Sequence, residues 1–133
     1  MGLGDLLYNS QVCSFCKDEP ERIIHLYWSC KHVQSFWSSF FHWINETSDS
    51  EISYNREDIL FGKFEGPKII NLIICLGKYH IYRRRLMKSL PCLELFKIEC
   101  SHYYKIEKYI FQVKCQLQDF NSRWTPMAHL FQE

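Results

Sequence analysis

Hydrophobic residues recur at helical intervals over most of this chain. Between residues 31 and 45 the large apolar side chains are three or four positions apart, at Val33, Phe36, Trp37, Phe40, Phe41 and Ile44. This period places them on one face of an amphipathic helix. A polar loop is expected at 45–51, and residues 55–62 predict a short helix that Asn55 caps and Gly62 ends.

Two longer helices are predicted in the second half of the chain. The first begins at Pro67 and extends to about Ser89, and its first part, 69–76, is apolar on all sides and requires burial. The second is predicted over 92–122 as one continuous helix. Its single apolar face consists of Ile106, Tyr109, Ile110, Val113, Leu117 and Phe120. The segment 121–127 ends it, and no alternating strand pattern is present.

Composition fits one small globular unit with an uneven charge. The chain has 133 residues, of which 47% are hydrophobic, enough to bury a core. Residues 1–62 carry four bases and nine acids, a net of −5, whereas residues 63–133 carry twelve bases and six acids, a net of +6. A charge difference of this kind points mildly to an anionic partner for the basic half.

No secretory signal or membrane-spanning run is apparent in the sequence. The longest apolar run, 69–77, is interrupted by Asn71 and is too short to cross a bilayer. We therefore expect an intracellular protein, nuclear or cytoplasmic, that is not secreted and has no membrane partner. Seven cysteines, an odd number, fit reduced thiols better than a disulfide scaffold.

Cysteines and a histidine near the start of the chain have the spacing of a metal site. The pattern is C-x2-C-x8-H-x4-C, with Cys13, Cys16, His25 and Cys30. Three thiolates and one imidazole complete a tetrahedral shell, as structural Zn²⁺ prefers. A closed shell leaves no position for water, so the single zinc would be structural and not catalytic.

Other interpretations of the cysteines stay open in the sequence. The four residues are also compatible with buried, idle thiols, or with a redox C-x-x-C pair that lacks its usual βαβ context. His32 is an alternative ligand to His25. A second metal site could combine members of one further set, whose spacings match no standard module: Cys75, Cys92, Cys100, His102 and Cys115.

The predicted architecture is mainly α, a small Cys3His zinc knuckle that leads into a helical bundle. Residues 1–50 would form the knuckle and the amphipathic helix. Residues 51–133 would form a helical carboxy-terminal region packed on them, so that the two parts make one compact unit.

The stretch "CSFCKDEPERIIHLYWSCKHVQSFW" resembles the zinc-binding carboxy-terminal region of LINE-type, non-LTR retrotransposon reverse transcriptase polyproteins. The positions that carry the resemblance are Glu21, His25, Leu26, Cys30 and Trp37, together with the later "ILFG", "KYHIYRRR" and "RWTPM" segments. The resemblance covers about residues 6–131. It implies an isolated piece that binds RNA or DNA, helps to place the element's RNA, and has the polymerase portion as a possible partner.

Basic residues cluster in the second half of the helix predicted to begin at Pro67. No acid occurs between Lys68 and Leu93. Arginines grip phosphates and tyrosines stack on unpaired bases, so this segment is a candidate nucleic-acid surface. The residues assigned to it are Lys78, Tyr82, Arg83, Arg84, Arg85 and Lys88. The alternative is a solvated helix end that acids on the next helix neutralise.

The leading hypothesis is a non-catalytic, zinc-dependent nucleic-acid-binding module without a small-molecule substrate. A second hypothesis is a protein-interaction domain, with an exposed apolar patch drawn from 69–76 or from Phe36, Trp37, Phe40 and Phe41. A third is a relic without selected function. Enzyme activity is not expected, because no paired carboxylates, Ser/His/Asp set or phosphate-binding glycine loop is present.

Overall fold

The computed structural model describes residues 12–46, 51–62 and 65–131. These residues are mainly helical and contain no β-strand, which confirms the predicted fold class. In chain order the elements are a π-helical turn η1 (His25–Ser29), α2 (Lys31–Asn45), α3 (Arg56–Phe61), α4 (Ile69–Leu86), α5 (Leu93–Val113), α6 (Leu117–Trp124) and a 3-10 helix η2 (Thr125–Phe131).

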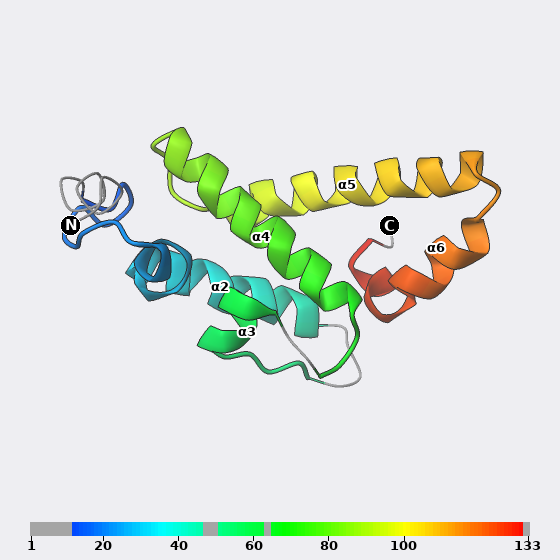
Figure 1. Ribbon diagram of the computed structural model, residues 1–133, viewed down its shortest axis with the longest axis horizontal. Coiled ribbons are helices and arrows are strands. Elements are labelled where there is room, and N and C mark those ends of the chain that lie inside the picture. Colours follow the sequence, from blue (N-terminus) through cyan, green and yellow to red (C-terminus); the bar gives the residue numbers. More distant parts are fainter. Residues whose placement is uncertain (1–11, 47–50, 63–64, 132–133) are drawn as a thin grey trace.

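Helices α2, α4 and α5 pack around one aromatic core, with α4 crossing between the other two (Figure 1). The apolar stripe of α2 faces this core, as its spacing predicts. Phe36 contacts His80 of α4 and Phe96 of α5, with ring centroids 5.3 and 5.8 Å away. The indole nitrogen of Trp37 donates to the carbonyl of Tyr27 (2.9 Å), which joins α2 to η1.

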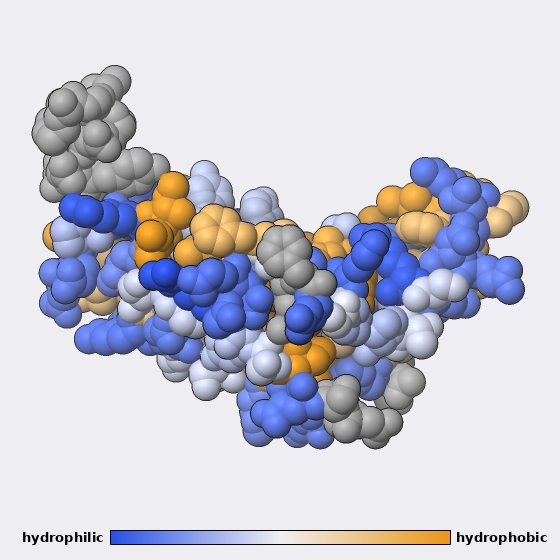
Figure 2. All heavy atoms as spheres, turned by 60° about the horizontal axis from the view of Figure 1, so that its bottom comes forward, coloured by the Kyte–Doolittle hydropathy of each residue, from blue (hydrophilic) through white to orange (hydrophobic). Residues whose placement is uncertain are grey.

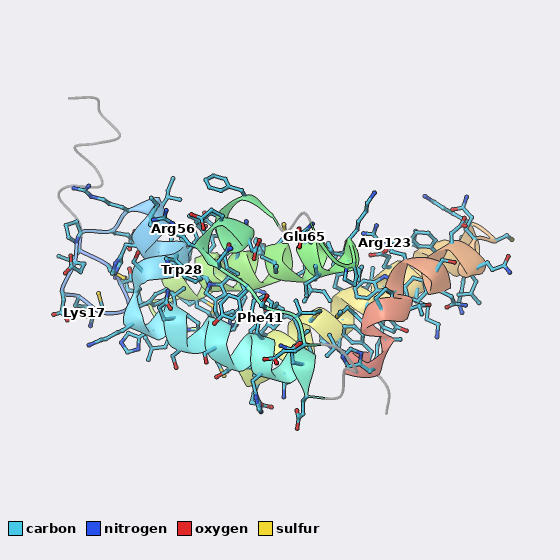
Figure 3. The ribbon with its side chains drawn as sticks, turned by 90° about the horizontal axis from the view of Figure 1, so that it is seen from below. Lys17, Trp28, Phe41, Arg56, Glu65 and Arg123 are labelled. Carbon is cyan, nitrogen blue, oxygen red and sulfur yellow. The ribbon has the colours of Figure 1, made fainter. Side chains whose placement is uncertain are left out.

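The short helix α3 lies against η1 and is capped as its sequence predicts. Asn55 and Asp58 form a reciprocal capping box, and Gly62 ends the helix at a φ of 99°. The segment before α3 is held by Tyr54, whose ring stacks on Phe41 (4.0 Å) and meets the edge of Trp28 (6.1 Å). Figure 3 labels Trp28 and Phe41 in this part of the molecule, with Lys17 near one end and Arg123 in the other half.

The prediction of one helix over 92–122 is wrong, because the chain turns at residues 114–116. Cys115 adopts a left-handed φ of 57°, and the amide of Gln116 donates back to the carbonyl of Phe111 (2.8 Å). This is a helix-ending motif that usually uses glycine. The turn folds α6 back on α5, so Phe120 packs against Tyr104 and Phe111.

The protein-interaction hypothesis expected an exposed apolar patch at residues that are buried in the structure. The α2 residues Phe36, Trp37, Phe40 and Phe41 are buried, as are four of the isoleucines within 69–76. Many of the exposed apolar residues lie instead on α5 and at the start of α6, and others, such as Leu86 and Met87, lie at the end of α4. No described helix combines the length and the hydropathy that a membrane span requires.

Gly77 sets the distance between α4 and α2. A Cβ at this position would lie 2.9 Å from Cη2 and 3.0 Å from Cζ3 of Trp37, and 3.4 Å from Phe40. Trp37 is fully buried, so its ring has no free space to enter. The glycine is therefore required by packing, within a helix where glycine is intrinsically unfavourable.

We predict that Gly77→Ala destabilises the protein by about 1–3 kcal/mol, because overpacking outweighs the gain of about 1 kcal/mol in helix propensity. Cys75→Ala, at an exposed position of the same helix, is the control and should change stability little. Denaturant unfolding of both variants measures the difference. A stabilised Gly77→Ala would show that α4 and α2 are not in close contact.

Candidate metal centre

A tight turn brings the first two cysteines to one point. The amide of Cys13 donates to the carbonyl of Glu19 (2.8 Å), and the amide of Lys17 donates to the carbonyl of Cys13 (2.9 Å). Lys17 closes the turn with a left-handed φ of 61°. The chain then enters η1, which carries His25, and Cys30 follows directly before α2.

The ligand atoms of Cys13, Cys16, His25 and Cys30 all lie within 4.8 Å of one another. Two distances fit the edges of a tetrahedron around a metal ion. The sulfurs of Cys13 and Cys30 are 3.8 Å apart, and Sγ of Cys16 is 3.3 Å from Nε2 of His25. Bonds of about 2.3 Å to sulfur and about 2.0–2.1 Å to nitrogen give edges of about 3.8 Å between two sulfurs and about 3.5 Å between sulfur and nitrogen, so the first distance matches and the second is slightly shorter. The four predicted residues therefore form a site that can hold one metal ion.

Backbone groups around the site favour the thiolate form of Cys16. Burial alone would raise the pKa of Cys16, but amide groups of Asp18 and Glu19 directed at it hold that pKa below its usual value. Burial raises the pKa of Cys13 to about 11, assisted by the charge of Cys30, although the amide of Phe15 donates to its sulfur (3.4 Å). A divalent cation among these sulfurs would stabilise all three as thiolates.

The structure selects among the alternative ligands. His25 belongs to the cluster and His32 does not. Within residues 12–46, 51–62 and 65–131 no second group of potential ligands converges, so Cys75, Cys92, Cys100, His102 and Cys115 form no further site there. Cys100 is buried in the core, which raises its pKa to about 12. It acts as a small apolar residue.

A buried ion pair fastens the metal centre to α4. Arg85 donates from Nε and Nη2 to Oε1 of Glu21, whose side chain is 3% exposed. The other oxygen, Oε2, accepts from the amide (3.2 Å) and hydroxyl (3.3 Å) of Ser14, between the two cysteines. Burial would raise the pKa of Glu21, but the bonds from Arg85 and Ser14 hold it below its usual value.

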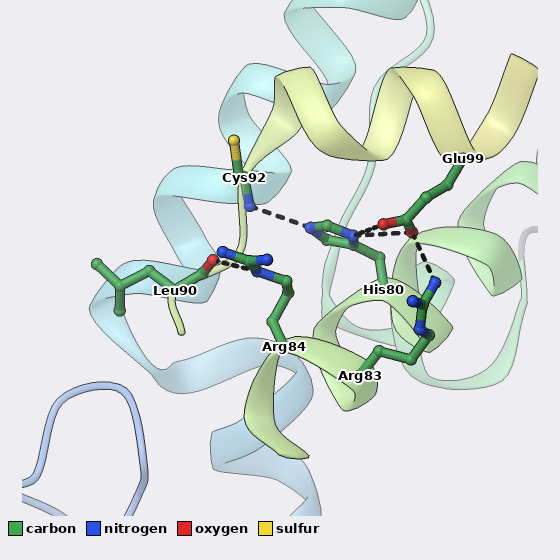
Figure 4. A network of polar contacts seen from close by, with 6 residues as sticks. All are labelled: His80, Arg83, Arg84, Leu90, Cys92 and Glu99. Carbon is green, nitrogen blue, oxygen red and sulfur yellow. Dashed lines mark hydrogen bonds and ion pairs between the residues drawn. The ribbon is translucent and has the colours of Figure 1, made fainter. Parts of the chain in front are cut away.

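A second network joins the end of α4 to the start of α5 (Figure 4). His80 is fully buried, and its Nε2 accepts from the amide of Cys92 (3.0 Å). Since Nε2 accepts, Nδ1 carries the proton and donates to Glu99 (3.0 and 3.2 Å). Burial lowers the pKa of His80 despite Glu99. Both ring nitrogens are therefore engaged in holding the two helices together.

Three of the six residues predicted to bind nucleic acid make contacts within the protein. Arg85 is held by Glu21, Arg84 donates to the carbonyl of Leu90 (2.8 Å), and Arg83 lies 3.7 Å from Glu99. Lys78, Tyr82 and Lys88 are the other three. Tyr82 and Lys88 are exposed and Lys78 is half-buried.

Sequence reasoning missed the roles of Glu21 and His80, whereas Glu99 is one of the acids on the next helix that the alternative interpretation of the basic segment expected. Glu21 entered only as a position of the family resemblance, and its partner is 64 residues away. The sequence feature that could have pointed to His80 is its helical position, which it shares with the buried residues of α4. Searches against models of protein families, curated proteins and solved structures found no match to this chain.

We predict that the purified chain binds one metal ion and that Cys16→Ser loses it together with helical signal, since the site fixes η1 and the start of α2. Cys75→Ser and Cys115→Ser, at exposed cysteines outside the cluster, should keep both. Elemental analysis and circular dichroism measure the result. Equal metal content in Cys16→Ser and wild type would contradict the site.

We further predict that Glu21→Ala and Arg85→Ala each cost about 3 kcal/mol of stability, because each leaves a charge without its partner. That value is at the lower end for buried pairs, since the Arg85 side chain is 23% exposed. The double variant should cost clearly less than the sum of the two. Removing the exposed pair Arg56–Glu57 is the control and should cost less than about 1 kcal/mol. Additive losses at Glu21 and Arg85 would show that the two residues do not interact.

Proposed function

We propose that this chain is a non-catalytic, zinc-dependent nucleic-acid-binding module in which a structural metal centre positions a basic and aromatic side of α4. The observation that carries the proposal is the exposure of two tyrosines on that side. Tyr79 is 59% exposed and Tyr82 is 41% exposed. Tyrosines in helices of a packed bundle are usually partly buried, whereas exposed ones are free to stack on unpaired bases.

Cations flank these tyrosines. Lys78 is adjacent to Tyr79 in sequence and one helical turn from Tyr82, and the guanidinium of Arg83 lies 5.9 Å from the centre of the Tyr79 ring. Lys88 lies exposed just beyond the end of α4. The proposed surface is therefore Lys78, Tyr79, Tyr82, Arg83 and Lys88. Arg84 and Arg85 support it from within the structure.

Zinc is the metal we propose for the centre. Three thiolates and one imidazole form the ligand set that structural zinc prefers, and the four protein ligands close the shell. With no open position, this ion holds the knuckle and takes no part in bond chemistry. Its binding free energy, on the order of 10 kcal/mol in comparable small modules, would support folding of the knuckle.

The metal centre and the proposed surface are mechanically connected. Glu21 bonds to Ser14 within the knuckle and to Arg85 on α4, so loss of the metal would release the basic end of that helix. The resemblance to the carboxy-terminal region of retrotransposon reverse transcriptases supports the same function. By that analogy the working ligand is RNA or DNA, within the cell.

We predict that the chain binds single-stranded RNA or DNA and that Lys78→Glu/Lys88→Glu weakens this binding for all sequences similarly. Loss of two phosphate contacts should reduce the slope of log K against log salt by about 2. Tyr82→Ala should weaken binding about tenfold or more, since stacking contributes about 1–3 kcal/mol per base. Fluorescence anisotropy across a salt series measures both effects.

The control for charge is Lys105→Glu/Lys114→Glu, which makes the same net change on α5. It should bind nucleic acid as wild type does, apart from a small long-range effect. If both double variants lose affinity equally, binding depends on net charge alone. If Lys78→Glu/Lys88→Glu binds as wild type does, this side of α4 is merely solvated.

A further inference from the structure

A long apolar stripe on α5 faces solvent. Ile106, Tyr109 and Val113 are 61–66% exposed, and Ile110 is 43% exposed. Their spacing continues toward the start of the helix with Leu95 and Ile98, which are also exposed, and Leu117 is exposed at the start of α6. Figure 2 shows hydrophobic side chains gathered at the end of the molecule formed by α5 and α6. From Ile98 to Val113 the stripe is about 22 Å long, at 1.5 Å per residue.

Two hollows border one side of this stripe. The first, of about 290 Å³, lies between α4 and α5 and is walled by Tyr79, Arg83, Phe96 and Tyr103 among others. The second, of about 350 Å³, lies between α5 and α6 and includes Arg123. Tyr103 and Ile106 line both hollows, so the two form one groove that runs from α4 to α6 along α5.

The charges along the carboxy-terminal part of the stripe are mostly positive. Over residues 100–117 the chain carries Lys105, Lys108 and Lys114 but only one acid, Glu107. That acid is already engaged, because Oε1 of Glu107 accepts from Arg123 (2.9 Å) and Trp124 (3.3 Å). Within the described part of the chain none of the three lysines forms an ion pair.

We propose that this groove and stripe bind one amphipathic helix of a partner protein, with acidic residues beside its apolar face. Helices that bind in grooves insert apolar side chains at i, i+3, i+4 and i+7, the spacing that the stripe itself presents. Acids on the partner would lie beside Lys105 and Lys114, on the two sides of the stripe. Such pairs add specificity and association rate to the apolar contact.

Charge and shape disfavour two other occupants of the groove, a second copy of the chain and a lipid surface. In an antiparallel pair of two copies centred near Ile106, Lys105 of each copy, on the same flank of the stripe, would approach Lys105 of the other. A lipid surface would have to dehydrate the Arg83–Glu99 and Arg123–Glu107 pairs, whose side chains line the hollows.

The test uses the full chain and three synthetic helical peptides of about four turns. One has leucines at i, i+3, i+4 and i+7, flanking glutamates and alanines elsewhere. The second has lysine in place of each glutamate, and the third has the acidic composition in scrambled order. We expect the ordered acidic peptide to bind at least about tenfold more tightly than either other peptide. Titration calorimetry measures the affinities.

Variants locate the site. Ile106→Ser/Val113→Ser should weaken the acidic peptide about tenfold or more, since exposed anchors dominate such interfaces. Lys105→Glu/Lys114→Glu should make the basic peptide bind more tightly than the acidic peptide. Leu86→Ser, an exposed apolar position on α4, is the control and should change neither affinity. Since the serine variants leave the cations and tyrosines of α4 intact, nucleic-acid binding should persist in them.

Three results would overturn the proposal. Equal or absent binding of all three peptides would show that the groove does not select an acidic helix. A dimer in sedimentation that Ile106→Ser/Val113→Ser dissolves would assign the face to a second copy of the chain. Binding to anionic phospholipid vesicles that the same variant abolishes would assign the face to a membrane surface.

Discussion

The carboxylate of Glu21 connects the two parts of this structure. One of its oxygens holds Ser14 in the cysteine turn, and the other receives the guanidinium of Arg85 from α4. A carboxylate that is almost fully buried is tolerated only when its oxygens are bonded in this way. The position of the metal centre relative to the helical core is thereby fixed by a pair of charges as well as by apolar packing.

This pair also changes how the basic segment of α4 should be understood. Of its three consecutive arginines, Arg85 secures the metal centre, Arg84 holds the loop before α5, and Arg83 shares Glu99 with the buried His80. The guanidinium groups of these arginines therefore bind mostly to groups of the protein itself. Under the proposed function, α4 would offer a ligand an aromatic surface with a few cations beside it, a composition that suits stacking on single strands better than gripping a duplex backbone.

Local patterns predicted most of the helices and the cluster of cysteines and histidine, because both depend on short-range spacing. The stripe of α2, the Asn55 cap and the Gly62 end are each visible within a few residues, and so is C-x2-C followed by His25 and Cys30. The break at Cys115 was not visible, because the residue that takes the left-handed conformation is not glycine. Contacts between distant residues, such as Glu21 with Arg85, leave no local pattern, and so the role of Arg85 could not be predicted, whereas an acid on the next helix near the basic segment, such as Glu99 beside Arg83, was an expected alternative.

The helices α2 and α5 show why an apolar face does not by itself predict a core. Both have apolar residues at the same helical intervals, yet the stripe of α2 is buried while most of that of α5 is exposed. The turn at 114–116 brings Phe120 and Trp124 onto the other side of α5, against Tyr104, so the core is completed without the stripe. The residues beside each stripe differ as well. Serines and glutamine accompany α2, whereas the exposed half of α5 is accompanied by lysines that form no ion pair among the residues that the structure describes. The spacing of apolar residues along a helix thus predicts that one helix face requires a partner. The charged residues beside that face indicate whether the partner lies within the chain.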